Sequence, residues 1–279
     1  MRINHNISAL NTFNALSKNT DATSKSMEKL SSGLRINRAA DDAAGLAISE
    51  KMRNQISGLQ QAQRNSQDGI SLIQTAEGGL NETQAMLQRM SELTVQAANE
   101  TLTTSDTQKI QAEITQLTSQ IDDIANQTKF NTKNILNTTS SITFQVGANG
   151  GETISMSLVD ATASSLGVSA SSLSDLSSIA SGSTLNQVAS ANLAKIQSAI
   201  NAISTDRSNL GAVQNRLEHT INNLSTSNEN LTAAESRIRD VDMAKEVMTL
   251  TKNNILSQAA QSMLAQANQQ PQGVLQLLR

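Results

Sequence analysis

The side chains that could bind a metal ion or transfer a proton are few in this sequence. The two histidines, His5 and His219, lie far apart along the chain, and neither belongs to a His-Glu-x-x-His pattern. The chain contains no cysteine, so it lacks the thiolates of many structural zinc sites. We therefore expect no zinc site and predict solvent-facing or hydrogen-bonded histidines.

One adjacent pair of carboxylates, Asp41 and Asp42, has the chemistry of a metal ligand pair or an acid/base pair. Adjacent side chains on a helix point about 100° apart, and no further ligand accompanies the pair. The pair is therefore predicted to cap a helix and to face its positive N-terminal end.

Two glycine-rich stretches have the composition of a phosphate-binding loop without its context. Gly78-Gly79 falls inside a predicted helix, where it costs about 2 kcal/mol of helix propensity. Close helix packing or a bend would explain it. Residues 147–151 separate two alternating segments and indicate a turn. With no fingerprint loop, ligand cluster or nucleophile–base pair, the sequence supports neither an enzyme nor a cofactor.

Composition narrows the class of protein further. Only 1% of the 279 residues are aromatic, so the chain has few of the large side chains that usually fill a deep core. The single proline is Pro271, so long helices elsewhere in the chain would not be interrupted by proline. The net charge of −3 argues against nucleic-acid binding. We expect no membrane span and no cleaved signal, because no apolar run approaches the ~20 residues needed and the N-terminus lacks an apolar core. A cytosolic protein and one exported by a dedicated machine both fit.

Periodicity gives the elements that position these residues. A 4-3-4-3 lattice crosses residues 196–238, with a few polar residues at intermediate steps. Its apolar members are Ile196, Ile200, Ile203, Leu210, Leu217, Ile221, Leu224, Leu231 and Ile238. Such a heptad seam predicts one helix roughly 60 Å long, which suits a rod better than a compact core.

Two further helices are predicted in the first half of the chain. Residues 56–97 carry two parallel apolar stripes, which would let one helix touch two neighbours. Residues 110–124 repeat the 4-3-4-3 spacing. Residues 103–106 offer caps for the start of this helix, and residues 126–131 are expected to end it.

The period changes to two on both sides of the glycine-rich turn. The alternating apolar residues are Ile142, Phe144, Val146, Ile154, Met156 and Leu158. They predict a β-hairpin near 140–160. The Ser-rich residues 161–184 are predicted to form a loop or a weak helix.

The chain ends are predicted to form weaker helices that need each other. Both are rich in Asn, Ser, Thr and Gln, so each helix would be marginal alone. The expected fold is therefore mainly α: a long coiled-coil-like helical hairpin or bundle with paired terminal helices and a small β-hairpin element. The apolar residues assigned to the terminal helices are Ile3, Ile7, Leu10, Phe13, Val247, Leu250, Ile255, Leu256, Met263 and Leu264.

Several segments resemble the flagellin family. The opening MRINHNISALNTFNAL and residues 31–48, SSGLRINRAADDAAGLAI, resemble its N-terminal signature. Residues 239–244, RDVDMA, and 274–279, VLQLLR, resemble its C-terminal one. Residues 144–149, FQVGAN, resemble the β element of its rod domain.

The resemblance implies two domains. The inner one, residues 1–40 with 240–279, would pair the terminal helices in the core of the flagellar filament. The outer one, residues 41–239, would be the helical rod with its β-hairpin, and the Ser-rich segment would stand where longer members insert variable domains. The implied function is a non-enzymatic subunit that polymerises with itself into an extracellular filament for motility.

The resemblance also implies a route and partners. The chain would be exported unfolded through the flagellar apparatus, with a chaperone holding its C-terminal segment, and cap and hook-junction proteins would take part in assembly. Independently of the resemblance, the residue types make Arg35 and Arg38 candidate ion-pair partners of Asp41 and Asp42 across subunits, and a solvated face is an equal alternative.

Residues 88–96 of the rod, QRMSELTVQ, resemble the stretch of many flagellins that the animal Toll-like flagellin receptor recognises. Carried over, the central contacts would be Arg89, Leu93 and, on the next helix, Glu113. The same surface would lie between protofilaments, and polymer contact would be its primary role.

The apolar stripes of the terminal helices suggest how ordering and assembly are linked. Because the terminal helices cannot bury their apolar stripes in a free monomer, we hypothesise that residues 1 to about 35 and 240–279 order only as neighbours arrive. The polar lattice steps Arg207, Gln214 and Asn228 would either let seams slide between packings or simply face solvent.

Two other classes of protein share parts of this sequence pattern. A hook–filament junction protein has a related terminal plan. A signalling helical hairpin would lack the β-hairpin and usually carry a membrane anchor. The matches at both ends and at residues 145–149 favour flagellin.

Overall fold

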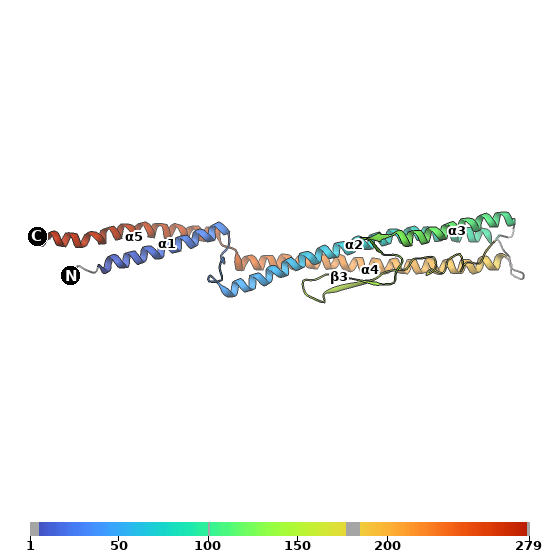
Figure 1. The fold of residues 1–279 in the computed structure, drawn as a ribbon, viewed down its shortest axis with the longest axis horizontal. Coiled ribbons are helices and arrows are strands. Elements are labelled where there is room, and N and C mark those ends of the chain that lie inside the picture. Colours follow the sequence, from blue (N-terminus) through green and yellow to red (C-terminus); the bar gives the residue numbers. More distant parts are fainter. Residues whose placement is uncertain (1–5, 100, 177–184, 278–279) are drawn as a thin grey trace. The chain divides into compact units, whose positions relative to one another are not determined.

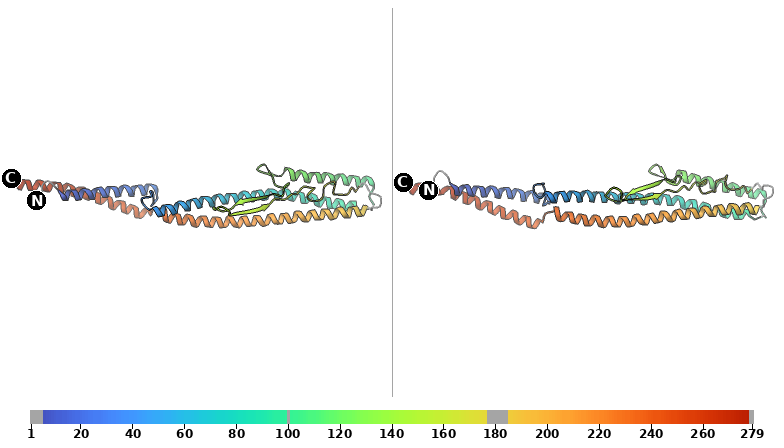
Figure 2. Two further views of the ribbon diagram at one scale, coloured as in Figure 1. Left: turned by 60° about the horizontal axis from the view of Figure 1, so that its bottom comes forward. Right: turned by 90° about the horizontal axis from the view of Figure 1, so that it is seen from below.

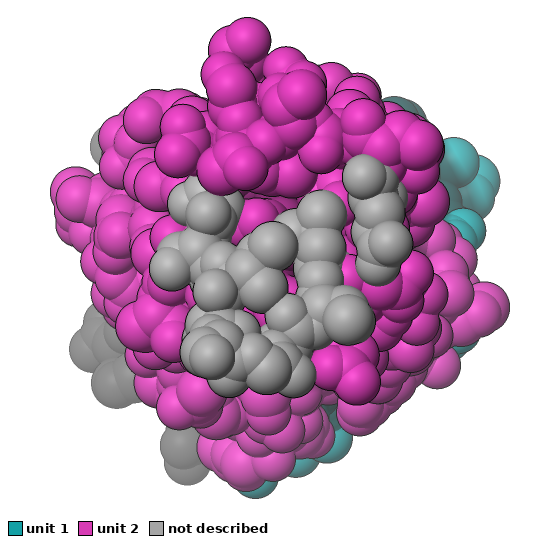
Figure 3. All heavy atoms as spheres, turned by 90° about the vertical axis from the view of Figure 1, so that its right-hand side faces the viewer, with its two compact units in different colours: residues 1–56, 229–279 teal, residues 57–228 magenta. Residues whose placement is uncertain are grey.

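The computed structural model describes residues 6–99, 101–176 and 185–277, and it divides into two compact units. Unit 1 comprises residues 1–56 and 229–279, and unit 2 comprises residues 57–228 (Figure 3). These bounds differ from the domain boundaries predicted from the sequence, which lie near residues 40 and 240. The difference arises because the ends of two long helices make their contacts in unit 1.

In unit 1, helices α1 (Ile7–Ser32) and α5 (Met243–Leu277) lie side by side, which confirms the predicted pairing of the terminal helices (Figures 1 and 2). The N-cap of α1 is Asn6, whose side-chain oxygen accepts a hydrogen bond from the Ala9 amide at 3.1 Å. Its amide group donates to the Ala267 carbonyl of α5 at 2.7 Å. Gly33 ends α1 in the left-handed conformation, with φ of 73°.

The segment after α1 is tied to the start of α5. The Arg35 amide donates to the Arg239 carbonyl at 2.6 Å, and the Val241 amide donates to the Gly33 carbonyl at 3.0 Å. A β-bridge between Leu34 and Asp240 lies between these bonds. Two passages of the chain far apart in sequence are thus joined through their backbones.

Unit 2 is built on α2 (Ala43–Ala97), α3 (Thr104–Gln127) and α4 (Leu185–Arg239), of which α2 and α4 continue into unit 1. Within unit 2 these helices run alongside one another (Figures 1 and 2). Several of their fully buried large apolar residues lie on the predicted lattices: Ile73, Leu80, Leu87, Ile121, Ile196, Ile203 and Leu217. The structure thus confirms the helical seams, and α4 begins eleven residues earlier than the predicted 196–238.

The start of α3 follows from its capping residues. The Thr103 side chain accepts from the Asp106 amide, and the Asp106 carboxylate accepts from the Thr103 amide at 3.3 Å. This capping box satisfies two donors that the first helical turn leaves unpaired. α3 ends at Gln127, inside the expected range.

The predicted β-hairpin is present as β3 (Ser141–Gln145) paired antiparallel with β4 (Thr153–Ser157). Ile154 and Met156 are buried, whereas the alternate residues of β4 are exposed. A second, unpredicted hairpin joins β1 (Lys129–Phe130) to β2 (Lys133–Asn134). Its two turn residues both have positive φ, 47° at Asn131 and 68° at Thr132, as a tight two-residue turn requires.

The described part of the Ser-rich segment is an irregular loop, which is one of the two predicted alternatives. Residues 177–184 of that prediction lie outside the described residues. Residues 161–176 have no regular structure but are well packed, and Ala161, Val168 and Leu176 are buried. The buried Asn192 side chain holds this segment, because it accepts from the Ser174 amide at 3.0 Å and donates to the Ser174 carbonyl at 2.8 Å.

Candidate functional site

Large apolar side chains are exposed on the paired terminal helices of unit 1. On α1, Ile7, Leu10 and Phe13 are 57–67% exposed. On α5 the exposed large apolar residues are Met243, Val247, Met248, Ile255, Leu256 and Met263. Leu250 and Leu264 are half-buried, and Ile3 lies outside the described residues. Folded monomers seldom leave so many large apolar side chains exposed, so these helices have the character of a binding surface.

Part of this surface is hollowed. A shallow groove of about 430 Å³ on α5 is lined by Val247, Met248, Thr251, Lys252, Ile255 and Leu256. Its walls are almost entirely apolar, apart from a threonine and a lysine. Such a groove suits the apolar face of another helix better than a polar ligand.

The four charged residues expected at subunit contacts make bonds within the chain. Asp41 accepts from the Arg38 amide at 3.0 Å and the Asn37 amide at 3.2 Å, and the first of these bonds chiefly lowers the pKa of the Asp41 carboxyl. Asp42 accepts from the Gly45 amide at 2.8 Å, as predicted for a cap at the start of α2.

The two arginines beside them are engaged as well. Arg38 forms a bidentate pair with Glu28 at 2.9 Å, and Arg35 donates to the Ile238 carbonyl. Pairing these residues across subunits would therefore compete with contacts that each chain already makes.

A further ion pair of unit 1, also not predicted, joins the end of α4 to α2. The Arg239 guanidinium, with 13% of its side chain exposed, pairs with Glu50 of α2. The hydrogen bond from Arg239 holds the pKa of the Glu50 carboxyl below its ordinary value. The two residues are 189 positions apart in the sequence, and neither lies in a motif that would have paired them.

In unit 2, Arg89 links α2 to α3. Its guanidinium donates to Glu113 at 3.0 Å and to Glu92 at 3.3 Å, and these bonds raise the pKa of Arg89. Arg89 and Glu113 are both about half exposed. Leu93, in contrast, is 2% exposed, so the expectation of a direct surface contact through Leu93 is not met. It lies on the apolar lattice and packs into the core.

The polar lattice steps differ from one another. Arg207 donates to Gln84 at 2.6 Å and to Glu77 at 3.3 Å, so it joins α4 to α2. Gln214 instead donates to Glu218 of its own helix at 3.0 Å. Arg207 is thus an interhelical contact and not a merely solvated step.

Metal and membrane sites find no support in the described part of the chain. His219 is exposed on α4, and His5 lies outside the described residues. No three histidine, cysteine or acidic side chains of residues 6–99, 101–176 and 185–277 gather in a way that would hold a metal ion. Of the helices described, none combines the length and the apolar character of a membrane span.

Both ends of the chain match known family models. Residues 3–141 match the bacterial flagellin N-terminal helical region, and residues 193–278 match the bacterial flagellin C-terminal helical region. The chain belongs to the flagellin family. It is 58% identical to flagellin of Bacillus subtilis (strain 168) and 47% identical to the flagellar filament 33 kDa core protein of Treponema phagedenis, with all of each chain covered.

A solved flagellin structure agrees with this membership. The crystal structure of Bacillus cereus flagellin shares 32% identity with a TM-score of 0.50, covering 62% of this chain and 94% of that one. A protein of Vibrio parahaemolyticus shares only the fold, at 14% identity and a TM-score of 0.59, covering 72% of this chain and 100% of that one. The flagellin family is one of structural proteins, so this short flagellin is a structural subunit of the flagellar filament and not an enzyme.

Proposed function

We propose that the exposed apolar faces of α1 and α5 form the contacts that hold neighbouring subunits together in the filament core. The observation that carries this proposal is the exposure of Leu10, Phe13 and Ile255, each more than half accessible in the single chain. Fully burying one such side chain contributes about 1.5–3 kcal/mol, so a few of them per neighbour suffice for stable association. A head-to-tail contact between different surfaces would repeat into an open helical polymer.

Seeded growth tests the assignment. Purified protein is added to sheared filament seeds, and elongation is followed by electron microscopy and sedimentation. We expect Phe13→Ser and Ile255→Ser to raise the monomer concentration left at equilibrium by at least tenfold. A matched control, Thr20→Ser, changes an exposed polar residue of α1 and should polymerise as the wild type does. Wild-type growth by both apolar variants would refute the proposal.

We also propose that folding of the terminal helices is coupled to assembly. Among the described residues of α1 only Ser26 is buried, so a free monomer offers these helices little apolar burial. Amide hydrogen exchange on monomers should therefore show weak protection at Leu10 and Leu256 and strong protection at Leu80. Strong protection of the two terminal positions in monomers would contradict the coupling.

The route and accessory partners are proposed from family membership. The chain would leave the cell through the flagellar export apparatus, with a chaperone on its C-terminal segment, and cap and hook-junction proteins would direct its assembly. The apolar groove on α5 supports a chaperone contact there, because it would be exposed before assembly. Ile255→Ser should then weaken chaperone binding, measured by co-purification, while Thr20→Ser should not.

A second function, recognition by the animal Toll-like flagellin receptor, is favoured by the Arg89–Glu113 pair. Both side chains are half exposed and present opposite charges at one place on α2 and α3. Leu93 would act only by supporting this surface from within. A receptor reporter assay on Arg89→Ala monomers should show reduced signalling, with Arg64→Ala as the control. Unchanged signalling would argue against this function.

A further inference from the structure

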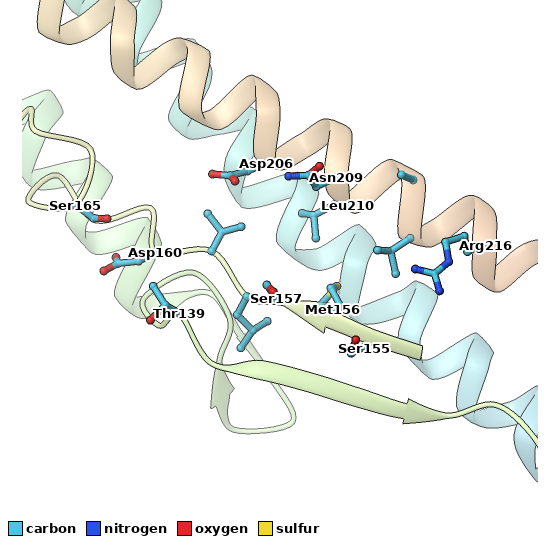
Figure 4. Close-up of a pocket in the computed structure, with 14 residues that line it drawn as sticks. Thr139, Ser155, Met156, Ser157, Asp160, Ser165, Asp206, Asn209, Leu210 and Arg216 are labelled. Carbon is cyan, nitrogen blue, oxygen red and sulfur yellow. The ribbon is translucent and has the colours of Figure 1, made fainter. Parts of the chain in front are cut away.

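Unit 2 contains a groove between α4 and the strand β4 with its following segment, which we call the α4–β4 groove. It has a volume of about 550 Å³ and is lined by Thr139, Ser155, Met156, Ser157, Leu158, Val159, Asp160, Ser165, Asp206, Asn209, Leu210, Ala212, Val213 and Arg216. Figure 4 shows Asp206, Asn209 and Arg216 on α4, with Ser155 and Ser157 on the facing strand. The groove on α5 is almost entirely apolar, whereas the α4–β4 groove contains several hydroxyl groups and charges of both signs.

The carboxylate of Asp206 has no hydrogen-bond or ion-pair partner among the described residues. It is only partly exposed, and burial alone raises the pKa of the Asp206 carboxyl. Arg216 lines the same groove but is ten residues further along α4, about 15 Å along the helix axis, which is too far for an ion pair. Asp160, across the groove, already accepts two hydrogen bonds from Thr162. The groove thus holds one carboxylate that the monomer leaves unpaired.

The same unit also carries unpaired cations. Most basic side chains of unit 2 are bonded within the chain: Arg64, Arg89, Lys109, Lys195 and Arg207. Among the described residues of this unit, Lys129, Lys133 and Arg216 make no such contact. The two lysines are exposed and flank the tight turn between β1 and β2. An unpaired acid in a groove and unpaired bases at a separate turn are complementary patches of one chain.

We propose that in the filament the α4–β4 groove of one subunit receives the β1–β2 turn of a second copy, so that Lys129 or Lys133 pairs with Asp206. This inference rests on the proposed function, since it requires copies of the chain to meet. Two different patches that complement each other fit a head-to-tail contact, which propagates without closing. The serines and threonine of the groove would bond the lysine's remaining N–H groups.

The pairing predicts opposite effects of one substitution in monomer and polymer. In the monomer, Asp206→Asn removes a charge that burial disfavours, so the melting temperature of the monomer should stay the same or rise. In the polymer the same change removes the ion pair, so the critical concentration for seeded growth should rise about threefold to tenfold. The control Asp68→Asn removes an exposed carboxylate of α2 and should leave both quantities unchanged.

Salt dependence gives a second readout. Raising the salt concentration screens a partly exposed pair, so the wild-type critical concentration should rise toward that of Asp206→Asn. An unchanged critical concentration for Asp206→Asn, or a lower melting temperature of its monomer, would overturn the inference. Failure of the wild-type chain to grow from seeds would overturn the proposed function together with it, so the two failures are distinguishable.

The absence of cysteine permits a direct test of the occupant. Asp206→Cys introduces the only thiol of the chain, and a short thiol-to-amine crosslinker can be applied to wild-type filaments doped with this variant. We expect crosslinks to Lys129 or Lys133 of isotopically labelled neighbouring copies, identified by mass spectrometry, in filaments and not in monomers. Crosslinks confined to the same chain, or to other lysines, would overturn the assignment.

Discussion

Replacing Gly58 of α2 with alanine tests whether the tip of the β3–β4 hairpin packs directly on this helix. A Cβ at Gly58 would stand 2.8 Å from the Cβ of Ala148 and 3.1 Å from its Cα. Carbon atoms in contact are normally about 3.5–4.0 Å apart, so the hairpin turn or the helix must move. Overpacking of this kind costs about 1–3 kcal/mol.

The same helix supplies a matched control. Alanine in place of glycine gains about 1 kcal/mol of helix propensity at either site. At Gly78 no atom lies within 4 Å of an added Cβ, so only the gain applies. We therefore expect Gly78→Ala to stabilise the protein by about 1 kcal/mol and Gly58→Ala to range from no change to a loss of about 2 kcal/mol. The difference between the two variants isolates the clash.

Urea unfolding followed by circular dichroism at 222 nm measures both free energies, on the basis of linear extrapolation. If Gly58→Ala stabilised the protein as much as Gly78→Ala does, the hairpin tip would not contact α2 as described. A change in the slope of free energy against urea for either variant would instead indicate an altered unfolded state.

Three further predictions concern the polar contacts. Asn192→Ala should lower the free energy of unfolding by about 1–3 kcal/mol, because the buried Asn192 side chain makes two hydrogen bonds to the backbone of Ser174; urea unfolding measures this. Thr103→Ala should cost about 1 kcal/mol, measured in the same way, because it removes the N-cap of α3. The hydrogen bond from the Arg38 amide chiefly lowers the pKa of the Asp41 carboxyl. The stability that this carboxylate gives the turn is therefore fully present at a pH above the ordinary pKa of an aspartate. It is lost as the pH falls through the lower pKa of the folded state. Exchange protection of the Arg38 amide should therefore persist at pH 5 and disappear in more acidic solution.

Each of these outcomes has a control. Ser190→Ala, at an exposed position of α4, should leave stability within about 0.5 kcal/mol, unlike Asn192→Ala. Equal losses for Thr103→Ala and Ser105→Ala would contradict a specific cap. Loss of Arg38 protection well above pH 5 would mean that the Asp41 carboxylate does not hold this turn.

The sequence predicted the elements in which burial repeats with a period. Ile196, Ile203 and Leu217 are buried because a helix returns the same face every seven residues, and the hairpin was predictable from the alternation that includes Ile154 and Met156. The β1–β2 hairpin was missed because its strands have two residues each, too few to show a period. The packing of residues 161–176 was missed because irregular chain buries residues such as Val168 without any spacing.

The candidate site was predictable only in part. The apolar residues of the terminal helices could be named from their types, but not which of them would face outward, since this depends on where α1 contacts α5. Glu50 and Arg239 could not be paired, because no local pattern relates residues on different helices. Leu93 was assigned to a surface by resemblance although its lattice position predicted burial, and the physical pattern was the better guide.

The hydrogen bond between Asn6 and Ala267 closes a loop of 261 residues, and this has a consequence for folding kinetics. Contacts of such high contact order form late, because the entropy of closing a long loop opposes them until shorter-range structure has formed. Unit 2 is one continuous segment and can form first, whereas unit 1 must wait for the last residues of the chain to emerge. The topology therefore determines the order in which the two units fold. A chain that ends before its final helix would lack unit 1, although it could still complete unit 2.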